Sequence, residues 1–156
     1  MVKRSQEGPL TAGGDVSVQL VALDAFFASA LSMTVDVLST ANLLGAALGG
    51  GRAPRFQWSV RTVGGEAVRS SSGLTVTSDG EVDPKHHDVL FVLGPGMADE
   101  TRVPSDVARP DTRALLPILQ RAREHTLLAA SCSSTFVLAE AGLLDGGEAT
   151  TSWWLA

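Results

Sequence analysis

The stretch DVLFVLGPG, residues 88–96, limits more than any other feature what this chain can fold into. Its central residues are apolar, without the polar alternation that a half-exposed strand shows. A run of this kind is typical of a strand buried on both faces, as in the middle of a parallel sheet. The glycines that follow it indicate a loop at the carboxyl end of the strand. We therefore expect a parallel sheet with helices on both of its faces.

The rest of the chain alternates between strand and helix patterns. Short β-branched runs predict strands, and apolar residues at steps of three and four predict helices that lie against a sheet. The predicted elements are strands at 16–23, 56–63, 88–96 and 126–131, helices at 31–44, 111–123 and after 133, and a small hairpin within 64–80. This order predicts a doubly wound α/β fold with a mostly parallel sheet.

The size and ends of the chain indicate one domain. A chain of 156 residues with 44% hydrophobic residues can bury a core of its own. Residues 1–14 lack periodicity and are expected to form a disordered arm, which leaves a single domain over 15–156. Ser152 resembles a helix N-cap, and Trp153–Ala156 resemble a first helical turn. We expect this domain to be incomplete at its C-terminus, and Trp153 and Trp154 to be either core residues of a last helix or an uncovered contact surface.

Charge and composition exclude several classes of protein. Twelve Lys and Arg stand against 17 Asp and Glu, for a net charge of −5, and no segment concentrates basic residues, so this chain alone is a poor binder of nucleic acid. One cysteine cannot form an internal disulfide. No signal peptide is recognised, and the apolar run Val16–Leu23 is too short to cross a membrane, so we expect a cytoplasmic protein with no membrane partner.

The only cysteine, Cys132, lies in a small-residue turn between a predicted strand and a predicted helix. Because ligands bind outside the carboxyl ends of strands in such sheets, we expect Cys132 to lie under the loop that contains Gly94 and Gly96. The N–H groups of Gly96 and Ser133 could then hold an oxyanion, and the unpaired N–H groups of the helix would lower a thiol pKa. Asp24 follows the first strand and could reach the same cleft.

A lone cysteine is more often a small buried hydrophobe than a nucleophile. A thiolate enzyme also needs a base, and His86, His87 and His125 all precede strands, whereas Cys132 follows one. The strand between His125 and Cys132 separates them by roughly 20 Å. The histidines are therefore expected to be solvated loop residues at the opposite edge of the sheet. No metal-ligand set or phosphate-binding loop is found in the sequence, and no cofactor is predicted.

Three segments together resemble a known family: DVLFVLGPG, VDVLSTAN at 35–42, and LLAASCSSTFVLAEAGLLDGGEATTSWW at 127–154. They are similar to the flavodoxin-like domain of the class I glutamine amidotransferase-like superfamily. More narrowly, they resemble the PfpI-type domain at the N-terminus of AraC-type transcriptional regulators of the GlxA kind.

The resemblance implies a role for individual positions. Cys132 corresponds to the family's nucleophile-elbow cysteine, and Gly94 and Gly96 correspond to its glycine loop. Ser152 stands where the family has a histidine, and Ala30 stands where its enzymes have an acidic residue. A serine cannot act as a base near neutral pH, and loss of such a base typically removes ~10²–10⁴-fold in rate.

Two hypotheses follow, with a third behind them. The first is a non-catalytic effector-sensing and dimerisation domain of an AraC-type regulator, without its DNA-binding domain in this chain. It would bind an unknown small molecule near Gly94, Gly96, Cys132, Ser133, Asp24 and Ser152, and form a homodimer. The second is a cysteine-dependent enzyme, such as an amidase, isonitrile hydratase or deglycase, with Cys132 as nucleophile. The third is a redox-sensing thiol protein.

Overall fold

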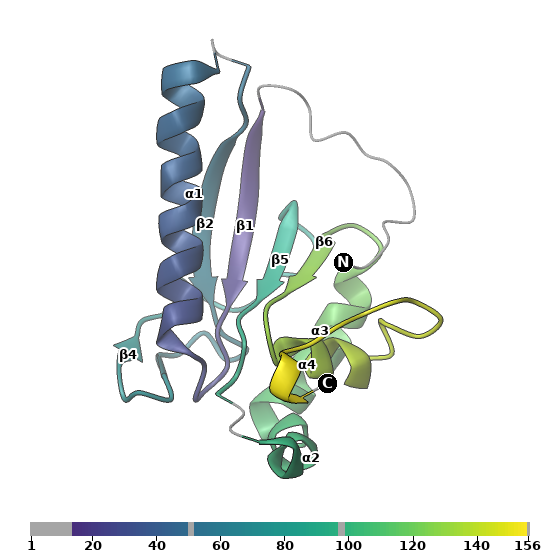
Figure 1. Cartoon of the computed structure of the whole chain (residues 1–156). Helices are drawn as coiled ribbons and strands as arrows, with labels where there is room; N and C mark the ends of the chain where they lie inside the picture. Colours follow the sequence, from purple (N-terminus) through teal and green to yellow (C-terminus); the bar gives the residue numbers. More distant parts are fainter. Residues whose placement is uncertain (1–13, 50–51, 97–98, 156) are drawn as a thin grey trace.

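A parallel sheet of four strands forms the centre of the protein, in the order β2-β1-β5-β6 (Figure 1). The computed structural model describes residues 14–49, 52–96 and 99–155. The strands are β1 (Asp15–Val21), β2 (Arg55–Arg61), β5 (Val89–Val92) and β6 (Leu127–Ala130). All three pairings within the sheet are parallel, which confirms the predicted α/β fold.

The predicted central strand is β5, with β1 on one side and β6 on the other. Leu90 and Val92 are fully buried on the face shared with the later helices. Val89 and Phe91 point to the other face and are only partly buried. The strand ends at Val92, before the glycines, because the loop that follows turns toward the first helix instead of pairing further.

Helices cover the two faces of the sheet unequally. Helix α1 (Ala28–Leu48) lies along β2 and β1 (Figure 1). Helices α3 (Pro110–Ala122) and α4 (Ser134–Glu140) share one apolar cluster with Leu90 and Val92 on the opposite face. The predicted helices are therefore confirmed.

Helix α1 is held on the sheet by one apolar face and one side-chain amide. Leu31, Val35 and Leu38 pack against the strands. Asn42 accepts a hydrogen bond from Phe56 N at 2.7 Å and donates one to Phe56 O at 2.8 Å. The amide therefore fixes the last turns of α1 at the start of β2.

By length and composition, α1 could also cross a membrane, with a mean hydropathy of 1.4 over its apolar part. This differs from the expectation drawn from Val16–Leu23, which is too short to cross a membrane. The contacts of α1 with β1 and β2 assign it to the α/β domain.

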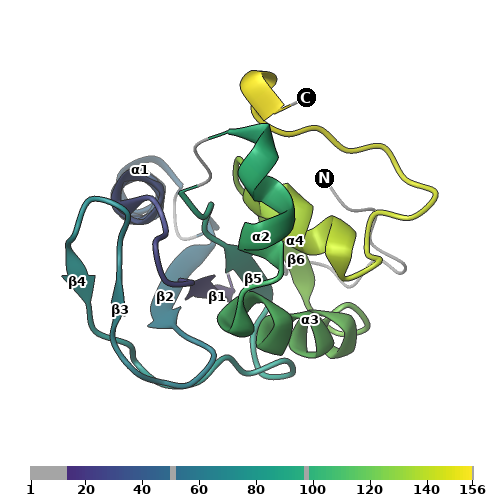
Figure 2. The ribbon, with the colours of Figure 1, turned by 90° about the horizontal axis from the view of Figure 1, so that it is seen from below.

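The predicted hairpin is present as β3 (Val68–Arg69) and β4 (Thr75–Val76), which pair antiparallel. Figure 2, seen from below, shows it beside α1 and β2. Gly73 has a φ of 87°, a conformation that glycine supplies without strain at the turn.

Two features differ from the sequence-based expectation. A 3₁₀ turn (Glu100–Arg102) and the short helix α2 (Val103–Val107) were not foreseen, and they begin where Asp99 accepts a hydrogen bond from Thr101 N at 2.9 Å. At the other end, Trp153–Leu155 form a 3₁₀ turn, with Trp153 85% and Trp154 45% exposed. The expectation that the tryptophans are core residues is therefore wrong in the described part of the chain. The predicted arm lies outside the described residues except for Gly14.

Candidate functional site

The chain reverses sharply at Cys132, between the end of β6 and the start of α4. Cys132 has a φ of 55°, in the left-handed region that few non-glycine residues occupy. Ser134 fixes the exit from this bend, because its fully buried hydroxyl donates to Val92 O at 2.9 Å. A strained backbone of this kind persists only where the surrounding structure holds it. The predicted bend is confirmed.

Gly94 brings the preceding loop into contact with this bend. A Cβ on Gly94 would lie 3.0 Å from Ser131 O and 3.3 Å from Cys132 Cβ, closer than most side chains tolerate. Gly94 N donates to Ser131 Oγ at 3.1 Å, and Ser133 Oγ donates to Pro95 O at 2.6 Å. The structure therefore confirms that Cys132 lies under the glycine loop.

The two predicted oxyanion donors are not equivalent. Gly96 N donates to Ala25 O at 2.8 Å, so the expectation that it is a free donor at the site is wrong. The cause is the bridge between Phe26 and Pro95, which turns the loop toward the start of α1. Ser133 is buried, and among the described residues its backbone N–H has no hydrogen-bond partner.

Ser152 is the side-chain partner of the sulfur. The distance from Cys132 Sγ to Ser152 Oγ is 2.7 Å, and either atom can donate. Thr151 Oγ1 donates to Cys132 O at 3.3 Å, and Thr135 Oγ1 donates to the same carbonyl at 2.8 Å. The chain after α4 thus returns to the bend and brings two hydroxyls to the sulfur and its carbonyl.

A hollow of about 510 Å³ opens beside Cys132. One wall is the edge strand β6, and another is the returning segment 149–152. Apart from Cys132, its lining side chains are apolar or carry hydroxyls: Leu127, Leu128, Ala129, Ala130, Thr135, Leu138, Leu144, Ala149, Thr150, Thr151 and Ser152. A hollow lined in this way favours a small uncharged ligand over an ion.

The histidines lie at the amino ends of the strands, opposite to the carboxyl ends where Cys132 lies, as predicted. His86 and His87 precede β5, and His125 precedes β6, whereas Cys132 follows β6 in the same parallel arrangement. Burial, and secondarily the charge of Arg61, lower the pKa of His87 below its ordinary value. Within residues 14–49, 52–96 and 99–155, no imidazole makes a hydrogen bond with the sulfur.

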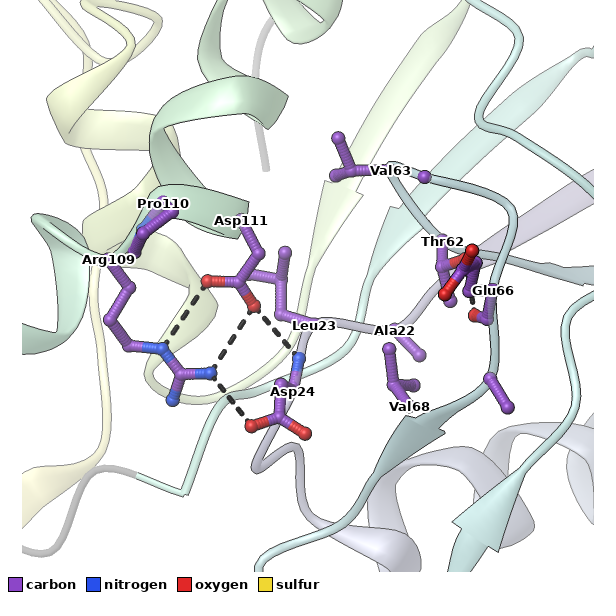
Figure 3. Close-up of a pocket in the computed structure, with 12 residues that line it drawn as sticks. Ala22, Leu23, Asp24, Thr62, Val63, Glu66, Val68, Arg109, Pro110 and Asp111 are labelled. Atoms are coloured by element: carbon purple, nitrogen blue, oxygen red, sulfur yellow. Dashed lines mark hydrogen bonds and ion pairs between the residues drawn. The ribbon is translucent and has the colours of Figure 1, made fainter.

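Asp24 is not brought to Cys132. It lines a separate hollow of about 440 Å³, whose lining shares no residue with the hollow beside Cys132 (Figure 3). Its carboxylate pairs with Arg109 Nη2 at 3.3 Å and accepts from Arg69 N at 3.1 Å. Asp111 pairs with the same Arg109 nitrogen at 3.3 Å and accepts from Asp24 N at 2.9 Å. This network joins the end of β1 to the start of α3.

Sequence reasoning missed Thr135, Thr151, Arg109 and Asp111. The two threonines sit close to Cys132 and Ser152 in the chain, and their hydroxyls could have been weighed with those residues. Nothing in the sequence paired Arg109 with Asp24, because 85 residues separate them. Ala30 stands where the family's enzymes have an acidic residue. Its side chain packs in an apolar cluster with Phe26 and Leu93 and offers no carboxylate. Among the described residues, no group of three His, Cys, Asp or Glu side chains could hold a metal ion.

Comparison with known proteins gives relatives among transcriptional regulators, although no protein-family profile matches the chain. The HTH-type transcriptional regulator CdhR of Pseudomonas aeruginosa is 37% identical over 100 residues, which cover 63% of this chain and 27% of the regulator. The HTH-type transcriptional regulator GbdR of the same species is 31% identical over 140 residues, which cover 88% of this chain and 34% of the regulator. This chain therefore spans about a third or less of these regulators.

A third relative matches over nearly its whole length. An uncharacterized protein in the cpoL 5′ region of Streptomyces lividans is 34% identical over 145 residues, which cover 92% of each chain.

Solved structures share the fold at lower identity. An AraC family transcriptional regulator from Pseudomonas putida superposes with a TM-score of 0.58 at 24% identity, covering 85% of this chain and 64% of that one. A DJ-1 superfamily protein from Agrobacterium tumefaciens gives a TM-score of 0.58 at 19% identity, covering 90% and 70%. A two-domain protein from Anabaena variabilis, with DJ-1/ThiJ/PfpI-like and ferritin-like domains, gives 0.62 at 21% identity, covering 87% and 35%. These likenesses establish the fold.

Proposed function

We propose that this chain is a non-catalytic effector-sensing and dimerisation domain of a transcriptional regulator. It belongs to the PfpI-type, class I glutamine amidotransferase-like family, in the group found in AraC-type regulators. The proposal concerns the role of this domain. Reading of DNA is assigned to another part of the regulator, because this chain has a net charge of −5. We place the regulator in the cytoplasm, where DNA is available to it.

One observation carries the proposal: the side-chain partner of Cys132 Sγ is Ser152 Oγ, at 2.7 Å. A hydroxyl cannot accept a proton near neutral pH, nor can it carry positive charge beside a thiolate. A cysteine with this partner lacks the base that covalent catalysis by a thiol requires. The bend therefore serves recognition in our proposal.

The hollow beside Cys132 defines the ligand by its chemistry. Its walls offer apolar contacts from β6 and α4, and hydroxyls that both donate and accept hydrogen bonds. A charged ligand would lose its hydration without gaining an ion pair there. The effector in this proposal is a small, uncharged, partly apolar molecule with at least one hydrogen-bonding group.

A signal can leave the site along the chain. Ser152 contacts the sulfur and directly precedes the exposed 3₁₀ turn Trp153–Leu155. An effector that takes the place of Ser152 on the sulfur would free that turn to move. In this proposal the tryptophans report occupancy of the hollow.

The proposal is tested by ligand binding measured at Cys132. A panel of short-chain neutral amides and alcohols, with matched carboxylates and amines, is screened by thermal shift and by protection of the thiol from iodoacetamide. We expect neutral compounds to raise Tm and slow alkylation, and Thr151→Val to weaken both effects. Asp24→Asn, in the separate hollow, is the matched control and leaves both unchanged. Binding that responds to Asp24→Asn and ignores Thr151→Val would refute the site.

A second candidate function is a cysteine-dependent enzyme. The observation in its favour is the left-handed backbone at Cys132, a strain of the kind found at active sites. It predicts turnover of small amides, isonitriles or aldehyde adducts that disappears in Cys132→Ala. Such turnover by the unaltered protein would replace the first proposal with the second.

A further inference from the structure

The hollow beside Cys132 runs along the outer edge of β6. Its lining includes every residue of that strand, from Leu127 to Ala130. Successive side chains of a strand point to opposite faces of a sheet, so one face of β6 cannot supply them all. β6 is the last strand in the order β2-β1-β5-β6, on the side of the sheet away from α1 (Figure 1). The hollow therefore meets the backbone of β6 as well as its side chains.

The backbone groups of β6 divide between β5 and the hollow. Leu127 N donates to Asp88 O at 2.9 Å, and Ser131 N donates to Val92 O at 3.2 Å. The odd-numbered residues therefore turn their N–H and C=O groups toward β5. Because these groups alternate in direction along a strand, the even-numbered residues turn theirs toward the hollow.

The even-numbered residues of β6 are Leu128 and Ala130. Each directs one N–H donor and one C=O acceptor into the hollow. Within the described ranges, no strand, turn or loop backbone pairs with these groups. A row of unpaired backbone groups on a strand edge is a template for another extended chain, which adds to the sheet as a further strand.

The spacing of these groups defines the ligand that fits them. One amino-acid residue with an amide on each side carries an N–H and a C=O on the same edge. Laid parallel to β6, its N–H donates to Leu128 O and its C=O accepts from Ala130 N, as between parallel strands. The carbonyl two positions earlier in the same peptide accepts from Leu128 N. A lone alcohol or amide lacks this row of groups and leaves part of the edge unpaired.

The walls of the hollow limit the length and the charge of this ligand. At 3.3 Å per residue, β6 offers an edge of roughly 13 Å, which suits a peptide of a few residues. The opposite wall is the segment 149–152, whose hydroxyls can bond the far side of the peptide. Among the described residues that line the hollow there is no Asp, Glu, Lys, Arg or His. A peptide with neutral, amide-capped ends therefore fits better than one with free termini.

We propose that the hollow binds a short, extended peptide with neutral ends, as an added strand hydrogen-bonded to the backbone of Leu128 and Ala130. The inference rests on the effector-sensing role in the proposed function and names the chemical class of the effector.

Backbone NMR of the full chain tests the added strand. The probe is N-acetyl-valyl-valine N-methylamide. We expect its binding to move the amide proton resonances of Leu128 and Ala130 downfield, and to move those of Leu127 and Ala129 less, because the latter face β5. Shifts confined to residues 149–152 would place the peptide on the opposite wall and overturn the proposal. Shifts at Leu128 and Ala130 that follow protein concentration without the peptide would assign the edge to a second copy, and would also overturn it.

A matched pair of peptides tests the hydrogen bonds by calorimetry. The control peptide is methylated on the nitrogen of its second valine, whose N–H is assigned to Leu128 O. We expect it to bind about tenfold more weakly, because the carbonyl is left without its donor. Ala130→Pro removes the N–H on the protein side, and an edge strand tolerates proline where the N–H points outward. It should weaken the unmethylated peptide about tenfold as well. Asp24→Asn, in the separate hollow, should change the affinity by less than about twofold, since distant sites act independently.

Two results distinguish this inference from the proposed function. Equal affinity for the two peptides, with simple neutral amides and alcohols still bound and still sensitive to Thr151→Val, would reject the added strand and keep the hollow as the effector site. The peptide pair decides this even if Ala130→Pro does not fold. A hollow that binds none of the neutral compounds would reject both proposals.

Discussion

The two ends of the parallel sheet carry different chemistry. At the carboxyl ends, the sulfur of Cys132 meets the hydroxyl of Ser152 beside a hollow with no other ionisable side chain. At the amino ends, His86 pairs with Asp83 at 2.6 Å, and Asp88 accepts a hydrogen bond from Ser17 N at 2.8 Å. The three histidines therefore lie at the end of the sheet that the sulfur does not occupy. Strand direction explains this difference, since every residue that precedes a parallel strand lies at one end and every residue that follows it lies at the other.

Under the proposed function, the fold keeps a sharp bend at Cys132 and uses it for recognition. The bend depends on Gly94, on Ser134 and on a left-handed Cys132, all of which are present. Catalysis would also depend on a base beside the sulfur, and the segment after α4 brings Ser152 there instead. Substitutions at the two ends of the sheet differ in their expected effect, and a side chain at Gly94 should have the greatest.

Gly94→Val should lower the free energy of unfolding by about 1–3 kcal/mol, because the new side chain would enter space occupied by Ser131 and Cys132. Urea unfolding measures the change. Gly64→Val is the matched control, since nothing lies within 4 Å of a Cβ at that position. Equal losses in the two variants would mean that the glycine loop does not press on the bend.

Cys132→Gly should be more stable than Cys132→Ala by about 1 kcal/mol, because only glycine adopts a φ of 55° without strain. Both variants remove the sulfur, so their difference isolates the backbone. Thermal unfolding of the pair measures it. Equal stability would show that the bend stores no strain.

Low pH should destabilise the fold through His87, which lies at the amino ends of the strands. The pKa of His87 is lowered by burial, so the folded protein resists a proton that the unfolded chain accepts below about 6.5. The free energy of unfolding should therefore fall as the pH drops through 6.5 toward the lower folded pKa, and then level off. Urea unfolding at a series of pH values should give a flatter profile for His87→Phe. Cys132→Ser, at the other end, should keep the slope of the unaltered protein.

Ser152→His should have the smallest effect. It restores an imidazole beside the sulfur, but Ala30 offers no acid in support. We expect no turnover of small amides, since one added imidazole lacks a supporting partner. A product assay measures it. A large gain in hydrolysis would mean that one substitution alone separates this domain from an enzyme.

Much of the fold could be predicted from local pattern. The apolar run at 88–96 indicated the central strand, and Leu31, Val35 and Leu38 keep the helical spacing of the face of α1 that packs on the strands. The meeting of Gly94 with Cys132 followed from strand direction. The role of Gly96 could not be predicted, because the bridge between Phe26 and Pro95 joins segments whose pairing has no periodic signal. The predicted placement of Asp24 beside Cys132 was wrong for a related reason. Asp24 does lie at the carboxyl end of its strand, but Arg109 and Asp111 hold it in another hollow.

NMR titration of the three imidazoles tests most directly whether a base lies beside the sulfur. Their ring resonances are titrated in the unaltered protein and in Cys132→Ser. We expect superimposable curves for His86, His87 and His125, because all three precede their strands and the sulfur follows one. A curve that moves when the sulfur is removed would place that imidazole beside Cys132 and contradict the assignment of this site to recognition.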